Sequence, residues 1–261
     1  MSITKEELFN RYIAFDKPVP YKNWLISPIK IKDYWECASL LGMLDIPKNE
    51  LGSIELIQMP YMTFYLSILM SEYDNLDALD RFLRIILNIE DDEVIQVTFD
   101  LKEIRVGKPI GKTRDNYDIL SENCRRINCV DFDEIKRIVL FQNIIDYTDE
   151  YVSKDVREQV ENYYRLKSNG HGTSLGHKVR CMAIALGVTK EVIGNMTMLD
   201  FNLTYETLSN SVEYTALKIA ETNGVKFKKP LKSWLFDEHV SKYEEAFVDA
   251  GSFESYVTSA N

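Results

Sequence analysis

Apolar side chains recur at helical spacing over most of the chain. Near the start, Thr4 and Glu7 precede the apolar positions Leu8 and Tyr12, a pattern that is typical of a capped helix. Similar periodicity predicts helices over 33–44, 61–71, 76–86 and 131–139, and later over 153–163, 175–186, 190–195, 204–222 and 233–250. The pattern therefore predicts a mainly α protein.

One central segment changes to a period of two. Apolar residues at 95, 97, 99 and 101 alternate with polar ones, which indicates a half-buried strand. Residues 104–106 are expected to return as its hairpin partner, and residues 127–130 to add a third strand. The intervening segment 107–123 is polar and turn-rich, so a long hairpin loop or an insert is expected there. The predicted fold class is mainly α with a small antiparallel β-sheet.

The two periodicities divide the chain into an α+β front half and an all-helical back half. A boundary is expected within 147–153, giving a domain over 1–150 with a β-hairpin near 94–130 and a helical domain over 151–261. Residues 168–174 form the clearest predicted loop, and the residues after Gly251 are expected to be a loose tail.

Composition and charge narrow the possible functions. The chain has 261 residues, of which 45 % are hydrophobic and 28 % charged, so it can bury a real core. Its formal net charge of −10 disfavours nucleic acid and anionic membranes as partners. The longest apolar stretch, 61–70, is too short to span a bilayer, and the first residues carry no apolar leader. These features predict a cytoplasmic protein with reduced cysteines.

The segment Gly107–Thr113 resembles a phosphate-binding loop. That motif needs four residues between its glycines and a helix that begins at the Lys-Thr pair, whereas here Gly107 and Gly111 enclose three residues. No apolar helical face follows. A hairpin turn and no nucleotide cofactor are therefore predicted.

Metal ligands and catalytic groups are sparse. His171, His177 and Cys181 could approach one another, but a fourth zinc ligand is missing and Cys124 and Cys129 lack the usual two-residue spacing. The remaining histidine, at 239, follows two acidic residues on a charged segment, and no nucleophile elbow is present. We predict no metal, no cofactor and no enzymatic activity.

The segment 183–196 fits the packing of a helix-turn-helix. Ala183 would let two helices approach, Gly187 would form the turn and Ile193 would fill the seam. The face that would read DNA offers no arginine and little charge: it carries Lys190, Glu191 and Asn195. The helix pair is expected, and DNA binding is disfavoured.

Aromatic and basic residues gather in the segment 226–236. Four lysines are interleaved there with Phe227, Leu231, Trp234 and Phe236, which predicts either a docking patch for a partner or a linker wrapped on the core.

Four phrases resemble virion-assembly proteins of tailed phages that infect Gram-positive bacteria, a group similar to tail assembly chaperones. They are YKNWLISPIKIKDYWE at 21–36, QMPYMTFYLS at 58–67, DFDEIKRIVLFQNIIDYTDEY at 131–151 and MAIALGVTKEVIGNMTMLDF at 182–201. The resemblance follows the order of the chain over most of its length and includes no catalytic signature. The chain departs from the group in the 107–123 insert and after Pro230.

This resemblance implies a protein in the cytoplasm of the infected host that binds a tape-measure protein while tail tube subunits polymerise. Methionine and aromatic surfaces suit such reversible binding of helices. The partner-binding residues predicted on this basis are Met182, Met196, Met198, Phe227, Trp234 and Phe236. A structural virion component and a helix-turn-helix regulator are the alternatives.

Overall fold

The structure is a computed structural model that describes residues 3–70, 74–114, 118–149, 152–167, 173–227, 230–236, 239 and 241–243. Among the described residues, helices account for 57 % and strands for 13 %, which confirms the predicted class, mainly α with small antiparallel sheets. The chain divides into two compact units: Met1–Ile144 with Asn195–Met198, and Ile145–Gly194 with Leu199–Asn261. Each unit is described by itself.

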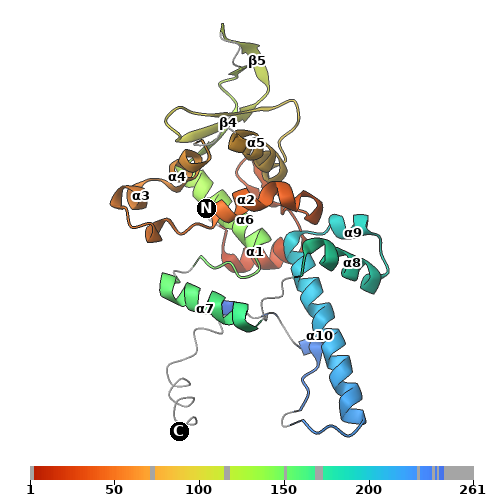
Figure 1. The fold of residues 1–261 in the computed structure, drawn as a ribbon. Helices are drawn as coiled ribbons and strands as arrows, with labels where there is room; N and C mark the ends of the chain where they lie inside the picture. Colours follow the sequence, from red (N-terminus) through yellow and green to blue (C-terminus); the bar gives the residue numbers. More distant parts are fainter. Residues whose placement is uncertain are drawn as a thin grey trace. The chain divides into compact units, whose positions relative to one another are not determined.

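The first unit is built on six α-helices (Figure 1). They are α1 (Lys5–Arg11), α2 (Tyr34–Leu44), α3 (Ile54–Gln58), α4 (Tyr61–Leu69), α5 (Asp74–Leu87) and α6 (Cys129–Asn143). Three 3-10 helices join them: η1 (Ile13–Phe15), η2 (Ile31–Asp33) and η3 (Lys48–Glu50).

The helix starts follow local capping chemistry. The Thr4 hydroxyl accepts a hydrogen bond from the Glu7 amide at 3.2 Å, which confirms the predicted cap of α1. At α6, Asn128 caps the helix, and its side chain accepts from the Asp131 amide at 2.9 Å.

Buried aromatic and aliphatic side chains from α1, α2, α4, α5 and α6 form the core of the first unit. One buried polar residue, Asn143, ties this core to a loop. Its side-chain oxygen accepts from the Ile29 amide at 2.8 Å, and its side-chain nitrogen donates to the Val139 carbonyl at 2.7 Å. Both backbone groups are thereby satisfied away from water.

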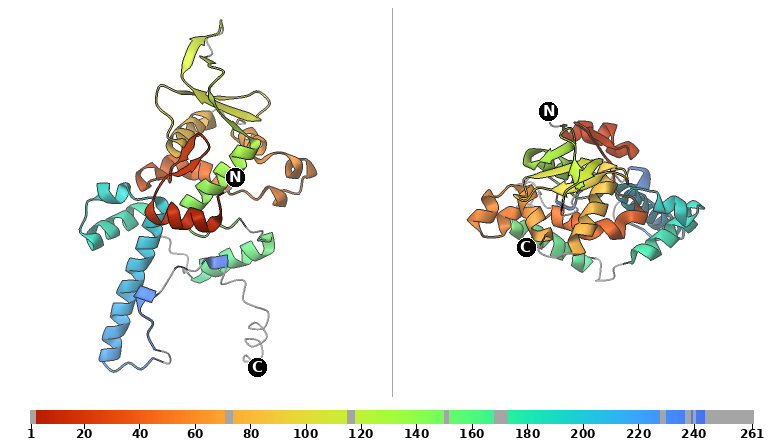
Figure 2. Two further views of the ribbon diagram at one scale, coloured as in Figure 1. Left: turned by 180° about the vertical axis from the view of Figure 1, so that it is seen from behind. Right: turned by 90° about the horizontal axis from the view of Figure 1, so that it is seen from above.

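Three small antiparallel sheets complete this unit. The hairpin β1 (Val19–Tyr21) with β2 (Trp24–Ile26) is the first. The central sheet has the order β3 (Val94–Val97), β4 (Glu103–Gly107), β7 (Arg125–Asn128), with Ile95 opposite Val106 and Ile104 opposite Ile127. The predicted insert forms its own hairpin, β5 (Pro109–Lys112) with β6 (Asp118–Leu120), which extends beyond β4 in Figure 2.

The predicted strand over 95–101 was too long. It ends at Val97, because a turn at 98–101 returns the chain into β4. Leu101 adopts a left-handed backbone with φ 55°, and the Thr98 hydroxyl bonds the Asp100 carboxylate at 2.7 Å. Phe99 is fully exposed at 103 %. The alternation of apolar and polar residues continues through this turn, whereas the hydrogen-bonded pairing of β3 with β4 stops at Val97. The predicted third strand, 127–130, was also displaced, since Cys129 already belongs to α6.

The second unit contains the remaining helices: α7 (Lys154–Lys167), α8 (Leu175–Leu186), α9 (Lys190–Gly194), most of α10 (Met198–Thr222) and the 3-10 helix η4 (Trp234–Phe236). The helix predicted over 233–250 is not continuous in its described part: η4 is a 3-10 helix, residues 239 and 241 are not helical, and residues 242–243 are helical. Residues 244–250, and residues 168–172 of the predicted loop, lie outside the described residues.

The segment Asn195–Met198 belongs to the first unit although the chain around it belongs to the second. The Ile31 amide donates to the Met196 carbonyl and the Met198 amide donates to the Ile29 carbonyl, each at 3.0 Å. The Thr197 hydroxyl bonds the Asp16 carboxylate at 2.6 Å. The chain thus returns to the first unit once after leaving it. The predicted boundary at 150 separates two domains that would fold independently. Nothing in the structure tests independent folding, so this boundary stays a prediction.

Within the described part of the chain, no helix has both the length and the apolar character needed to cross a bilayer.

Candidate functional site: a groove between α8 and α10

Helix α8 is fixed at both ends by local chemistry. The Ser174 hydroxyl accepts from the His177 amide at 3.3 Å at its start. At its end Gly187 adopts a left-handed backbone with φ 66°, and the Val188 amide returns to the Ala183 carbonyl at 3.0 Å. This turn sends the chain directly into α9. The predicted helix pair is therefore confirmed, with Ile193 fully buried.

Helices α8 and α10 border an open groove of about 400 Å³. From α8, the lining residues are Cys181, Met182 and Ala185. From α10, they are Tyr205, Leu208, Ser209, Val212 and Glu213. The α10 residues lie three or four positions apart, so they share one face of the helix. Apart from the hydroxyls of Tyr205 and Ser209 and the carboxylate of Glu213, the groove is apolar or weakly polar.

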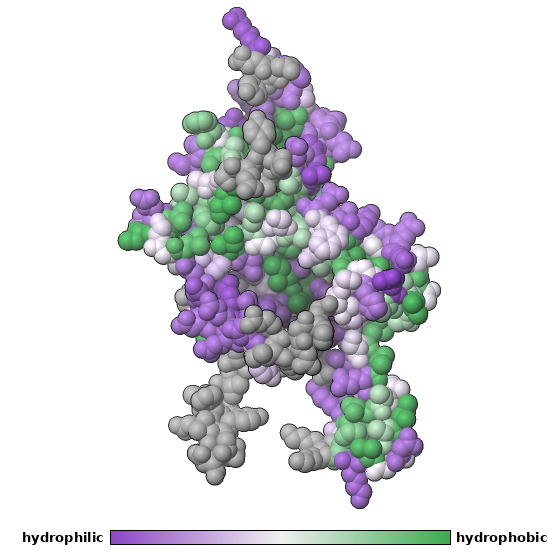
Figure 3. Space-filling view, in the orientation of Figure 1, coloured by the Kyte–Doolittle hydropathy of each residue, from purple (hydrophilic) through white to green (hydrophobic). Residues whose placement is uncertain are grey.

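Exposed aliphatic side chains continue the groove on both helices. Ile184 on α8 is 82 % exposed and Val212 on α10 is 71 % exposed. Hydrophobic residues also gather over the far half of α10, where Ile219 is exposed, as Figure 3 shows in green. Exposed apolar side chains beside a groove are a feature of sites that bind other proteins.

One basic side chain of α8, Lys178, lies beside the groove. This helix carries Lys178 and Arg180 and no carboxylate. The Lys178 ammonium lies 5.0 Å from the centroid of the Tyr205 ring, a cation–π contact across the two helices. The one carboxylate of the lining, Glu213, lies further along α10. A ligand of the groove would therefore lie near one cation, Lys178, and one carboxylate, Glu213.

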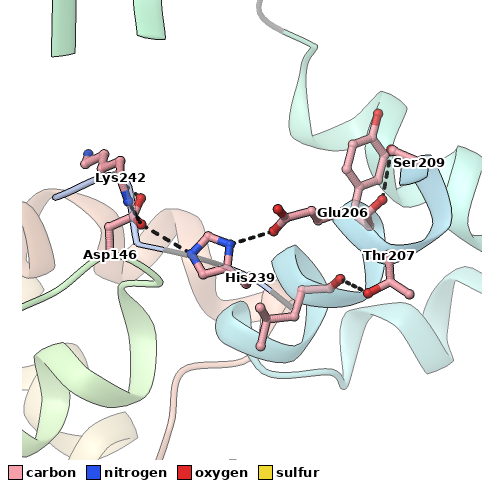
Figure 4. A network of polar contacts seen from close by, with 8 residues as sticks. Asp146, Glu206, Thr207, Ser209, His239 and Lys242 are labelled. Carbon is pink, nitrogen blue, oxygen red and sulfur yellow. Dashed lines mark hydrogen bonds and ion pairs between the residues drawn. The ribbon is translucent and has the colours of Figure 1, made fainter. Parts of the chain in front are cut away.

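A polar network lies beside the groove (Figure 4). His239 Nδ1 lies 2.8 Å from Glu206 Oε2 on α10, and His239 Nε2 lies 3.3 Å from Asp146 Oδ1. The Lys242 amide donates to the same Asp146 oxygen at 3.1 Å. Figure 4 shows the imidazole between the two carboxylates. The network ties the chain after η4 to the middle of α10.

The network is better suited to holding the chain than to catalysis. Each ring nitrogen of His239 faces a carboxylate oxygen, so neither is available to take a proton from a substrate. Among the described residues, no serine or cysteine side chain is bonded to this imidazole. A nucleophile–base pair of the kind that acyl transfer needs is therefore missing around His239.

The first unit has a larger but mixed-charge pocket of about 820 Å³. Its charged lining residues include Asp16, Lys30, Lys32, Asp33, Arg84 and Asp91. The Arg84 guanidinium is already engaged: Nε donates to Asp80 at 2.6 Å, Nη1 to the Glu90 carbonyl and Nη2 to the Glu93 carbonyl. Because cations and carboxylates alternate around this pocket, its charge selects no class of ligand.

The metal and nucleotide hypotheses gain nothing from the geometry. Cys181 Sγ lies 3.3 Å from His177 Nε2, as their i, i+4 spacing requires. His171 lies outside the described residues, and the described residues contain no cluster of three metal-ligating side chains. The segment predicted as a turn at Gly107–Thr113 contains strand β5, which pairs with β6, and the next described element after it is β6 and not a helix.

The six predicted partner-binding residues are scattered. Met182 lines the groove but is only 1 % exposed, while Met198 is buried and Met196 half-buried in the first unit. Phe227 and Trp234 are half-buried, and the side chain of Phe236 lies outside the described residues. The structure places one of the six, Met182, in the lining of the groove, and partner contact by all six stays a prediction.

Sequence reasoning missed the α10 side of the groove. Tyr205, Leu208, Val212 and Ile219 repeat at intervals of three, four and seven, which is a usable helical signal. Such a stripe is usually part of a core, so only its exposure in the structure marks it as a surface.

Comparisons with known proteins found no match to this chain among family models, curated proteins or solved structures.

Proposed function

We propose that this chain is a non-enzymatic assembly chaperone that binds an amphipathic helix of a phage tape-measure protein in the groove between α8 and α10. The observation that carries the proposal is the exposed apolar surface that continues from the groove over both helices. A groove between helices is a common way to bind a helix whose apolar residues recur every three or four positions. The resemblance to tail assembly chaperones supplies the identity of the partner.

The physical need for such a chaperone is clear. A long tape-measure protein exposes amphipathic helices, and these would self-associate before tube subunits enclose them. An acidic partner with net charge −10 keeps the complex soluble while its groove covers the apolar face. Binding through an open groove is reversible, because each helix segment buries a limited area.

The test is a pull-down of the tagged chain from phage-producing cells at moderate salt, read by mass spectrometry. Wild type is compared with Val212→Glu, which places a charge in the groove at a position that is 71 % exposed. Ile110→Glu is the matched control, because Ile110 is equally exposed at 71 % but lies on β5.

We expect recovery of the tape-measure protein to fall at least about tenfold for Val212→Glu, since a charge buried in an apolar contact is costly. Recovery should be unchanged for Ile110→Glu. Equal recovery by all three proteins would remove the groove from the proposal, and recovery of no tail protein by wild type would refute the function.

The α8–α9 pair supports a second candidate, a helix-turn-helix regulator, because its turn geometry is the expected one. Its exposed face offers Lys190 beside Glu191, so little charge is left for phosphate. Retention of the purified chain on duplex DNA, with affinity that falls steeply as salt rises, would favour this candidate.

A further inference from the structure

We propose that two copies of this chain associate through the groove between α8 and α10, with the two α10 helices running in opposite directions. In this dimer, α10 of each copy lies along the groove of the other copy. The inference goes beyond the proposed function, because it concerns the chain in the absence of any other protein.

The apolar stripe of α10 has the spacing of helices that pair with one another. Its members recur at intervals of three, four and seven residues: Tyr205, Leu208, Val212 and Ile219. Thr215 fills the remaining position, so the stripe keeps the period of 3.5 residues that is typical of a coiled-coil seam. Val212 and Ile219 are exposed, which leaves this seam open to a second helix.

The stripe is complementary to a second copy of itself when the two helices are antiparallel. A two-fold axis at the level of Asn210 places Leu208 of each copy opposite Val212 of the other, because each lies two positions from the axis. The same register places Tyr205 opposite Thr215. A two-fold axis makes each contact occur twice and closes the assembly at two copies.

The hydroxyl groups along this seam are satisfied within their own helix. The Ser209 hydroxyl donates to the Tyr205 carbonyl at 2.9 Å, and the Thr215 hydroxyl donates to the Ser211 carbonyl at 2.8 Å. Covering these side chains with a second helix therefore leaves neither hydroxyl donor unsatisfied.

Charge favours α10 of a second copy as the occupant of the groove. Helix α8 carries Lys178 and Arg180 and no carboxylate, so its formal charge is +2 without His177. Helix α10 carries one lysine and four carboxylates, so its formal charge is −3. In the antiparallel arrangement the basic α8 of each copy lies beside the acidic α10 of the other, and opposite charges of this kind favour association.

Two charged residues beside the groove are free to make this contact. Within the described part of the chain, neither Lys178 nor Glu213 has an ion-pair partner. Lys178 lies at the level of Tyr205, since its ammonium is 5.0 Å from the centroid of that ring. The two-fold axis brings Glu213 of one copy to the level of Thr207 of the other, within one helical turn of Tyr205. Each Lys178 therefore meets a Glu213 from the other copy.

The contact is small, so the dimer is expected to be weak. Helix α8 is ~18 Å long and the α10 stripe from Tyr205 to Ile219 is ~21 Å long, at ~1.5 Å per residue. Interfaces that bury less than ~1,200 Å² in total are typical of transient association. If the proposed function holds, a partner helix has to displace α10 of the second copy before it binds.

Sedimentation velocity of the purified full chain measures the association, and we expect a monomer–dimer equilibrium at micromolar concentrations. Lys178→Glu and Glu213→Lys should each raise the dissociation constant at least about tenfold, because each places like charges together twice. The double exchange should restore most of the affinity, a result that loss of folding cannot produce. Lys112→Glu, an exposed charge reversal on β5, is the control and should leave the dissociation constant unchanged.

A disulfide cross-link locates the axis. Ser209→Cys and Thr207→Cys are compared, each in a chain with Cys181→Ser, which removes the exposed thiol of the groove. The two positions are matched, because both hydroxyls are exposed and bond a carbonyl four residues earlier, but they lie about 200° apart around the helix. A disulfide needs Cα atoms about 4.4–6.8 Å apart. Mild oxidation should therefore yield covalent dimer at least about tenfold faster for Ser209→Cys.

A chain that stays monomeric throughout the micromolar range would overturn the proposal. A dimer that responds equally to Lys178→Glu and Lys112→Glu, or that cross-links equally at both cysteine positions, would overturn it too, because the contact would lie elsewhere. The assays contain no partner, so they are independent of the chaperone function. A dimeric chain that recovers no tape-measure protein would refute the function alone, and a monomeric chain that recovers it would refute the dimer alone.

Discussion

At the scale of single residues, Lys136 on α6 is a half-buried charge that affects how stability depends on pH. Its ammonium lies 3.4 Å from the centroid of the Tyr61 ring, and burial lowers the pKa of Lys136 from 10.5 to about 8. Desolvation disfavours the charged amine, and the ring face offsets part of that cost. Between pH 8 and 10.5 the unfolded chain keeps a proton that the folded chain has lost, so stability rises with pH across this window.

The substitution Lys136→Met should therefore stabilise the protein at pH 7 by about 1–3 kcal/mol, because it keeps the apolar stem and removes the buried charge. The gain should shrink towards pH 10. Urea unfolding of both chains at the two pH values measures the difference. Cys37, whose thiol pKa burial raises to about 12, contributes equally to both chains and cancels.

Lys112→Met on the exposed strand β5 is the control and should change stability little at either pH. A stability gain for Lys136→Met that is the same at pH 7 and pH 10 would contradict the assignment of the effect to the buried ammonium.

At the scale of elements, α8 shows that local capping residues can determine where a helix begins and ends. Its bounds, 175–186, match the prediction, because Ser174 and Gly187 mark the two ends with standard capping residues. The strand predicted over 95–101 shows the limit of such patterns. The polarity alternates to Leu101, but the ladder stops at Val97, where a turn that has the same polarity pattern begins.

Two glycines at the ends of α8 make a matched test of this capping. Gly187 has φ 66° and Gly176 does not have positive φ, yet an added Cβ would meet nothing within 4 Å at either position. Gly187→Ala should destabilise the second unit by about 1 kcal/mol through backbone strain alone. Gly176→Ala should stabilise it by up to about 1 kcal/mol, because alanine favours the helix.

Thermal unfolding followed by circular dichroism reads both changes. The opposite signs are the essential result, since packing is the same at the two sites. A loss of stability in Gly176→Ala equal to that in Gly187→Ala would show that the φ angle at the α8–α9 turn is not what requires glycine.

At the scale of the whole molecule, the chain returns to its first unit through Asn195–Met198. Thr197 anchors this return: it is 4 % exposed and its hydroxyl bonds Asp16 at 2.6 Å. Thr197→Val should therefore destabilise the packing of Asn195–Met198 on the first unit by about 1–2 kcal/mol. The substitution leaves the Asp16 carboxylate without the hydrogen bond that the Thr197 hydroxyl donates.

Hydrogen exchange measures this loss of stability locally. The Ile31 and Met198 amides donate hydrogen bonds between Asn195–Met198 and residues 29–31, so their exchange reports on this contact. Their protection should fall about tenfold, which corresponds to ~1.4 kcal/mol. Thr207→Val, which removes an exposed hydroxyl bonded to the Leu203 carbonyl in α10, should leave both amides unchanged. Unaltered protection in Thr197→Val would show that the hydroxyl contributes little.

The sequence by itself determined the class of the fold, most helices and the α8–Gly187–α9 turn. Each depends on contacts between residues a few positions apart, such as caps, turns and apolar periodicity, which the order of residues states directly.

Only the tertiary structure decided which apolar stripes are buried and which stay exposed. The α10 stripe of Tyr205, Leu208 and Val212 has the spacing of a core face, yet it borders an open groove because α8 covers it only in part. The return of Thr197 to Asp16 and the burial of Lys136 are similarly invisible in local patterns. Such features depend on contacts between residues that are distant in sequence. The free energy of each contact depends on how the partners pack, which only the folded structure shows.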